Sequence, residues 1–178
     1  DGFCDNPEQL QKLRPLNLYG WSKHIFDVNA LRLANLNQHP RQWVGLKFFN
    51  AYGPNEYHKG SQQSVISQFY RQIVAEGKAY AFKSYHPNYE HGGQMRDFIW
   101  IGDCVDVLIW AYEHINVTGI FNCGTGVARS FSDVLSSCFS AAQCPEAVKF
   151  IDCPTQIRSK YQYFTEADLT KLRRTGYD

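Results

Sequence analysis

Short apolar runs alternate with longer amphipathic stretches along this chain, and the alternation narrows the possible folds more than any other feature. Runs with the length and composition of buried strands occupy residues 43–49, 79–82, 96–101, 119–123 and 147–151. Amphipathic helices are expected from about residue 17 to residue 36, over residues 61–76, and after residues 103 and 130. Strands that alternate with helices predict an α/β fold with a largely parallel sheet.

Capping and turn signals set the expected boundaries of these elements. Asp103 is positioned to cap one helix, and Ser130 with Asp133 forms a capping box for the next. Thr165 and Asp168 predict the cap of a last helix, which ends near residue 176. We expect a turn at residues 50–54 and loops at residues 1–16 and 84–94, where Gly, Pro, Asn and His gather or apolar periodicity is absent.

The composition argues against several classes of function. The 178 residues are 44% hydrophobic, which is enough to fill a core, and the net charge of +1 offers no basic surface for nucleic acid or for a membrane. No apolar run approaches the roughly 20 residues of a membrane span, and no signal peptide is visible. We expect a cytoplasmic protein with no nucleic-acid partner and no membrane association.

The six cysteines form no C-x-x-C pair and have no histidine partner at zinc spacing. Most of them lie in apolar segments, where reduced thiols behave as small buried side chains. The sequence therefore predicts structural thiols and no metal site.

Tyr19 and Lys23 are four residues apart in the first predicted helix, and so one turn apart on the same face. An ammonium group beside a phenol favours the phenolate. Such a phenol can exchange a proton with a substrate hydroxyl while hydride passes to a nicotinamide cofactor. The alternative is an ordinary surface tyrosine and lysine, because both residues are common. Taken alone, the pair leaves both interpretations open.

Four motifs follow one another at fixed spacing. They are Tyr19 with Lys23, the run Phe-Phe-Asn-Ala-Tyr-Gly-Pro at residues 48–54, Arg-Asp-Phe-Ile-Trp-Ile-Gly-Asp-Cys-Val at 96–105, and Ile-Phe-Asn-Cys-Gly-Thr-Gly at 120–126. In this order they resemble the extended short-chain dehydrogenase/reductase family. The resemblance implies a Rossmann-like parallel sheet that binds a nicotinamide dinucleotide, with a smaller α/β lobe for the substrate.

Three further stretches narrow the resemblance: His-Lys-Gly-Ser at residues 58–61, the run at residues 161–170, and Gly-Tyr-Asp at residues 176–178. They are similar to the ADP-glyceromannoheptose 6-epimerase subfamily, bacterial isomerases that supply the heptose precursor of lipopolysaccharide. The resemblance implies tightly bound NADP as cofactor, an ADP-heptose or related nucleotide-sugar as substrate, and a homo-oligomer, which is pentameric in the heptose enzymes.

The same resemblance shows what this sequence lacks. In the family, a glycine-rich phosphate loop and a catalytic serine or threonine precede the tyrosine motif, and neither occurs here. We expect the chain to be the carboxyl-terminal part of an epimerase, inactive by itself. Residues 1–54 and 97–126 would form the remaining part of the NADP-binding Rossmann domain. Residues 55–96 and 127–178 would form the substrate-binding lobe.

The resemblance implies that C6 of the heptose is oxidised to a ketone, which is then reduced on its other face. Two faces require two acid/base groups. By analogy, Tyr19 serves one side and Lys59 the other, and Lys23 orients the nicotinamide ribose and acts on Tyr19. Ala51 and Lys59 would also contact the cofactor. If the match of residues 58–61 to the family is set aside, Lys59 is expected to be an ordinary solvated charge in a loop.

The remaining residues that match the family are assigned to substrate binding. They are Asn50, Ser61, Gln68, Phe82, Lys83, Ser84, Tyr85, Arg96 and Tyr161. Arg96 suits a pyrophosphate, because its planar fork can bind two oxygens, although a salt bridge to Asp97 is the alternative. Asn50 could instead form a turn, and Tyr161 could pack in the core. Gln68 stands where the heptose enzymes are expected to carry histidine, and residues 86–93 look inserted.

Two other functions stay open at this point. One is a different nucleotide-sugar epimerase or dehydratase that uses Tyr19 alone. The other is a non-catalytic fragment that lacks the phosphate loop and exposes a sheet edge and an apolar face, which would favour oligomerisation.

Overall fold

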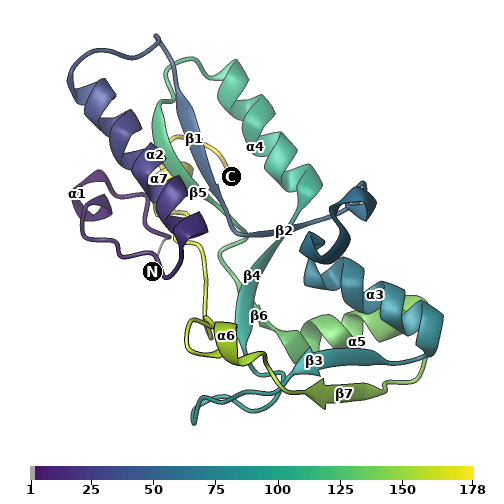
Figure 1. Cartoon of the computed structure of the whole chain (residues 1–178). Coiled ribbons are helices and arrows are strands. Elements are labelled where there is room, and N and C mark those ends of the chain that lie inside the picture. Colours follow the sequence, from purple (N-terminus) through teal and green to yellow (C-terminus); the bar gives the residue numbers. More distant parts are fainter. Residues whose placement is uncertain (1–2) are drawn as a thin grey trace.

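The computed structural model describes residues 3–178, and it has two parts joined by a central three-stranded sheet (Figure 1). The upper part in Figure 1 contains α2 (Leu18–Asn35), β1 (Val44–Phe48), α4 (Ile101–Glu113) and β5 (Gly119–Cys123), with the short helices α1 (Pro7–Leu10) and α7 (Thr170–Arg173) beside them. The lower part contains α3 (Val65–Glu76), β3 (Ala79–Phe82), α5 (Phe131–Ala142), β7 (Val148–Ile151) and α6 (Thr155–Arg158). Between them run β2 (Asn50–Tyr52), β4 (Met95–Trp100) and β6 (Ala128–Ser130).

Three of the four strand pairs are parallel, as the alternation of strands and helices predicts. β1 pairs with β5, β2 with β4, and β3 with β7, and all three are parallel. The fourth pair, β4 with β6, is antiparallel. Because β4 lies between β2 and β6, it is the strand that holds the centre of the molecule together.

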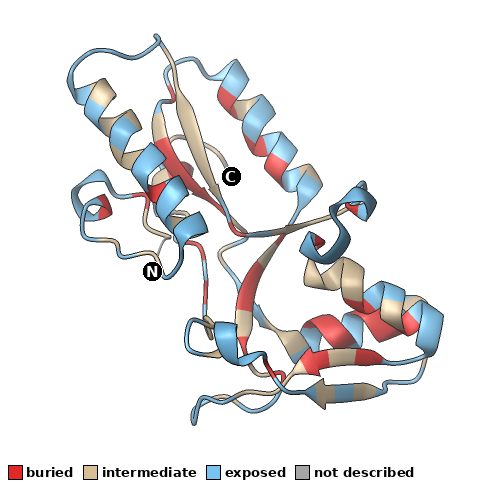
Figure 2. Cartoon of the chain, in the orientation of Figure 1, coloured by how far each residue is buried: buried red, intermediate tan, exposed pale blue. Residues whose placement is uncertain are grey.

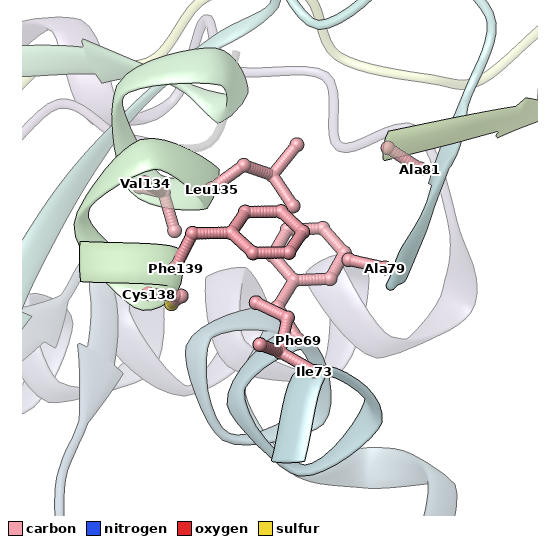
Figure 3. Close-up of a cluster of buried hydrophobic side chains, with 8 residues drawn as sticks. All are labelled: Phe69, Ile73, Ala79, Ala81, Val134, Leu135, Cys138 and Phe139. Atoms are coloured by element: carbon pink, nitrogen blue, oxygen red, sulfur yellow. The ribbon is translucent and has the colours of Figure 1, made fainter. Parts of the chain in front are cut away.

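Two clusters of buried side chains correspond to the two parts (Figure 2). The lower cluster packs α3 and α5 against β3, and it consists of Phe69, Ile73, Ala79, Ala81, Val134, Leu135, Cys138 and Phe139 (Figure 3). The upper cluster includes Ile99, Val107 and Phe121, with Leu172 from the carboxyl-terminal segment. The domain boundaries expected from the sequence stay a prediction.

Several helix boundaries agree with the local signals in the sequence. Asn17 caps α2, since its side chain accepts a hydrogen bond from the backbone N–H of Gly20. The capping box of Ser130 and Asp133 at the start of α5 is confirmed in both directions. Gly77 ends α3 in the left-handed conformation, at φ 68°.

Other expected boundaries are wrong. Residues 50–52 form β2 rather than a turn, because the backbone of β4 offers them hydrogen bonds. Asp103 lies within the first turn of α4, whose N-cap is Trp100. The last helix begins at Thr170 with Leu169 as N-cap, so residues 165 and 168 do not form its capping box. The expected loop at residues 1–16 contains α1, and β6 and α6 were not foreseen.

All six cysteines are free thiols. Within residues 3–178, no helix combines the length and the apolar character that a membrane crossing requires. The same residues contain no group of three or more His, Cys, Asp or Glu side chains that could hold a metal ion.

Candidate active site

Tyr19 and Lys23 lie on the first two turns of α2, as their spacing predicts. The Lys23 ammonium is 5.1 Å from the centre of the Tyr19 ring, and 73% of Tyr19 is exposed. The Asn17 cap fixes the first turn of the helix, and the Ser22 hydroxyl donates a 2.8 Å hydrogen bond to the Tyr19 carbonyl. The phenol is therefore held beside a cation and is open for contact with a ligand.

An ion pair joins this helix to the neighbouring strand. Lys47, near the carboxyl end of β1, donates to Asp27 on α2 at 2.5 Å, and their side chains are only 10% and 14% exposed. His24 is the only residue of α2 that is buried. The pair therefore provides a polar contact between α2 and β1 in addition to the half-buried apolar residues of the helix. Sequence spacing did not reveal it, because the partners lie 20 residues apart on different elements.

Asn50 and Ala51 lie on β2, directly after β1. Asn50 is exposed and Ala51 is half-buried, and they pair with Phe98 and Ile99 of β4. Loops and residues at the carboxyl ends of parallel strands are the usual location of ligand sites in α/β sheets. Both residues are thus placed where a ligand could reach them.

Lys59 lies on a 3-10 helix, η1 (Tyr57–Gln62), which follows β2. Lys59 and Ser61 are exposed, and the Gln68 side chain donates a 2.8 Å hydrogen bond to the carbonyl of Gln63 at the end of this segment. The buried carboxylate of Glu56 accepts hydrogen bonds from Gly53 and Ser64, on either side of the segment. Burial of Glu56 opposes its ionisation. The bonds from Ser64 and Gly53 and the charge of Lys59 outweigh that effect, so the pKa of Glu56 is lowered.

Arg96 is a buried cation without an acidic partner among the described residues. It is 8% exposed, and its guanidinium donates only to the carbonyls of Met95 and Gln162. The ring centres of Tyr161 and Phe131 lie 5.5 and 5.9 Å from it. Burial lowers the pKa of Arg96, which reflects the cost of a desolvated charge. An anion at this position would relieve that cost.

The alternative of a salt bridge between Arg96 and Asp97 is excluded. Asp97 is fully buried and points away from Arg96, because adjacent residues of a strand face opposite sides. Its carboxylate accepts from the backbone N–H groups of Thr125, Gly126 and Ala167 and from the Thr125 hydroxyl, at 2.7–3.0 Å. These four donors satisfy the carboxylate without any cation.

Tyr161 contacts both Arg96 and Phe82. The Tyr161 ring centre is 6.4 Å from that of Phe82, with the rings nearly perpendicular. Burial raises the pKa of the Tyr161 phenol. The structure thus brings together three residues assigned to substrate binding that are far apart in the sequence.

Lys83, Ser84 and Tyr85 form the start of the next loop. Lys83 pairs with Asp152 at 3.1 Å, and the Tyr85 hydroxyl donates to the same carboxylate at 2.7 Å. That hydrogen bond raises the pKa of Tyr85 and lowers the pKa of Asp152. The Arg158 guanidinium lies 3.7 Å from the Tyr85 ring centre. Sequence reasoning missed Asp152 and Arg158, because no local pattern links them to this loop.

The predicted residues therefore form three groups. Tyr19 and Lys23 form one, the segment with Lys59, Ser61 and Gln68 forms the second, and Arg96 with Tyr161 and Phe82 forms the third. Within residues 3–178 no hydrogen bond or ring contact joins one group to another. The first group lies on α2, the second on η1 and α3, and Arg96 of the third lies on β4 itself (Figure 1).

The sequence as a whole can be compared with known proteins. A model of the NAD dependent epimerase/dehydratase family matches residues 4–124. The chain belongs to this family. Membership implies a nicotinamide cofactor for the enzyme, and it agrees with the α/β fold and the largely parallel strand pairing described above.

Curated relatives place the chain within the family. It is 48% identical over 175 residues to an ADP-L-glycero-D-manno-heptose-6-epimerase of Nitratidesulfovibrio vulgaris (strain DP4), covering 98% of this chain and 53% of that protein. A protein of the same name from Fusobacterium nucleatum subsp. nucleatum is 45% identical over 184 residues, covering 99% and 54%. The chain spans about half the length of the curated relatives it matches.

Solved structures of epimerases share the fold. An ADP-L-glycero-D-manno-heptose-6-epimerase of Helicobacter pylori has a TM-score of 0.61 at 25% identity, over 84% of this chain and 47% of that one. A UDP-glucose 4-epimerase of Thermus thermophilus, solved in complex with NAD, has a TM-score of 0.73 at 22% identity, over 93% and 50%. The second likeness concerns the fold alone.

Proposed function

We propose that this chain carries the substrate site and part of the cofactor site of an epimerase that inverts C6 of ADP-glyceromannoheptose. The observation that carries the proposal is the buried Arg96, which has aromatic neighbours and no acidic partner among residues 3–178. Such a guanidinium is suited to a pyrophosphate. The high identity to proteins named heptose 6-epimerases supports this choice of sugar.

Substrate binding would use the second and third groups together with Asn50 and the start of the loop after β3. Arg96 and Tyr161 would bind the pyrophosphate, and Phe82, Lys83, Ser84 and Tyr85 would line the nucleotide side. Asn50, Ser61 and Gln68 would face the sugar, because they lie on β2 and around the segment that carries Lys59. The exposure of Asn50 and Ser61 supports this assignment, since neither side chain is used in the core.

Two acid/base residues would serve the two faces of C6. Tyr19 would exchange the proton of the C6 hydroxyl on one face, and Lys59 would do so on the other. Both side chains are exposed and reach towards solvent from fixed backbone positions. Lys23, which lies over the Tyr19 ring, would bind the nicotinamide ribose.

The cofactor is proposed to be NADP. When bound, it would accept a hydride from C6 and return it. Lys23, Ala51 and Lys59 would hold its nicotinamide side, and the exposed Tyr19–Lys23 pair and the half-buried Ala51 leave room for such a group. The sequence contains no G-x-G-x-x-G loop, so its residues fit only that side of the cofactor. We further propose a homo-oligomer in the bacterial cytoplasm.

The proposal is tested by replacing Lys59 in the full-length natural protein. Lys59→Ala should abolish epimerisation of ADP-glyceromannoheptose and leave NADP bound, as measured by a chromatographic assay of the two epimers and by nucleotide extraction. Lys78→Ala is the matched control, because Lys78 is exposed and its ion pair, at 3.5 Å, is with a surface glutamate. Retained epimerisation in Lys59→Ala would overturn the two-base assignment. Preferred turnover of UDP- or GDP-sugars would overturn the choice of substrate.

A further inference from the structure

Glu56 holds both ends of the segment that carries Lys59. It is 7% exposed although it lies in a polar loop. One carboxylate oxygen accepts from the Gly53 N–H at 3.1 Å and from the Ser64 hydroxyl at 2.8 Å, and the other accepts from the Ser64 N–H at 2.5 Å. Gly53 follows β2 directly, and Ser64 caps α3. A single carboxylate therefore connects the end of the strand to the start of the helix.

The segment between these two points needs such a connection. Asn55 and Gly60 both have positive φ, at 68° and 54°, a conformation that is costly for a non-glycine residue such as Asn55. No residue from 57 to 62 is buried, so no apolar packing holds the segment in place. The Lys59 N–H donates to the Glu56 carbonyl at 2.9 Å, which places the lysine one turn from the carboxylate.

We infer that Glu56 is a positioning residue for Lys59: its carboxylate fixes the segment so that the Lys59 ammonium meets one face of the reacting carbon. The inference rests on the proposed function, because it assumes that Lys59 serves one face and Tyr19 the other. The lowered pKa of Glu56 supports it, since the hydrogen bonds from Ser64 and Gly53 and the charge of Lys59 favour the ionised carboxylate.

Glutamine cannot replace this carboxylate without the loss of at least one of its hydrogen bonds. Its amide has one acceptor oxygen, whereas Glu56 uses both oxygens to accept three hydrogen bonds. One glutamine orientation would turn an NH2 group towards the Ser64 N–H, and the other would turn it towards Gly53. Either way one end of the segment is released. A displacement of about 1 Å at a reacting group can slow a reaction by roughly 100-fold.

A comparison of the two C6 epimers separates the positioning role of Glu56 from a general loss of folded protein. In the full-length natural protein, single-turnover reduction of the bound cofactor is measured with each C6 epimer of the ADP-heptose. One epimer depends on Lys59 and the other on Tyr19. Glu56→Gln is expected to slow the Lys59-dependent epimer by at least about 10-fold relative to the other. Glu76→Gln, an exposed carboxylate on α3, is the matched control and should leave the ratio unchanged.

Lys59→Ala serves as the reference. If Lys59→Ala changes the ratio and Glu56→Gln does not, the positioning role is wrong and the proposed function stands. If Lys59→Ala leaves both rates unchanged, the two-base function fails, and the positioning role fails with it. Equal slowing of both epimers by Glu56→Gln would show a structural effect only and would also overturn the inference.

Hydrogen–deuterium exchange gives a second measurement that needs no activity. In Glu56→Gln, exchange should accelerate in peptides covering residues 53–64, because either the Gly53 or the Ser64 amide loses its acceptor oxygen. Peptides from β1 and β5 should keep their exchange rates. Unchanged exchange at residues 53–64 would contradict the role of Glu56, even if the variant had lost activity for another reason.

Discussion

Replacing Asp27 by alanine should loosen the helix that carries Tyr19. The change removes the Asp27 carboxylate, which lies 2.5 Å from the Lys47 ammonium in a pair whose side chains are only 10% and 14% exposed. Loss of one member of a buried ion pair costs about 3–5 kcal/mol. The pair keeps some contact with solvent, so we expect a loss of about 3 kcal/mol, at the lower end of that range.

The free energy of unfolding can be measured by urea titration, followed by tryptophan fluorescence. Trp21 on α2 and Trp43 before β1 report on the two elements that the pair connects. For a domain of 150–250 residues, a loss of about 3 kcal/mol corresponds to a decrease in melting temperature of roughly 6–12 °C. Asp27→Asn keeps an acceptor oxygen without the charge, and it should lose roughly half as much.

Glu76→Ala is the matched control for this prediction. It breaks the pair of Glu76 with Lys78, whose N–O distance is 3.5 Å and whose side chains are 45% and 48% exposed. Exposed pairs contribute at most about 1 kcal/mol, so its effect should be less than about 0.5 kcal/mol. Equal and small losses in Asp27→Ala and Glu76→Ala would refute the reasoning, since burial would then make no difference.

Three further predictions concern single positions. Asp97→Ala should lower the free energy of unfolding in urea by at least about 3 kcal/mol, because it leaves four donors without their acceptor in a fully buried site. Gly53→Ala should cost more than about 2 kcal/mol, since its Cβ would lie 2.2 Å from Ile101; Gly77→Ala, at φ 68° with no neighbour within 4 Å, should cost only about 1 kcal/mol in the same assay. The pKa of Glu56 is lowered in the folded state, so its contribution is complete above the ordinary glutamate pKa of about 4.3 and is lost as the pH falls through the lower value. Exchange protection of residues 53–64 should therefore decrease only below about pH 4.3, and a decrease between pH 7 and 5 would contradict the assignment.

Features of the structure that depend on local interactions could be predicted from the sequence. The pairing of Tyr19 with Lys23 follows from helical spacing, and the capping box of α5 follows from the residue types at the start of that helix. Where pairing is non-local, the same reasoning failed. Residues 50–54 contain Asn, Gly and Pro, which favour a turn, yet residues 50–52 form a strand because β4 lies beside them.

In the candidate site, too, local features could be predicted from the sequence and non-local contacts could not. Its residue types and their order could be found in the sequence, because each motif is contiguous and the resemblance to the family assigns it a role. Whether Arg96 has an acidic partner could not be found, since Asp97 is adjacent in the sequence but faces the opposite side of β4. The role of Glu56 could not be predicted either, because it depends on hydrogen bonds from the Gly53 and Ser64 N–H groups, which only the folded chain brings together.

By itself, the sequence determined the α/β class, most strand and helix positions, and the family, since these depend on periodicity, capping and motifs within short stretches. The tertiary structure alone decided which charges are paired and which are left without a partner of opposite sign. Asp97 is satisfied by backbone donors, Asp27 by Lys47, and Arg96 by carbonyls and aromatic rings. The physical reason is that desolvation and pairing depend on distances across elements, and sequence separation does not encode those distances.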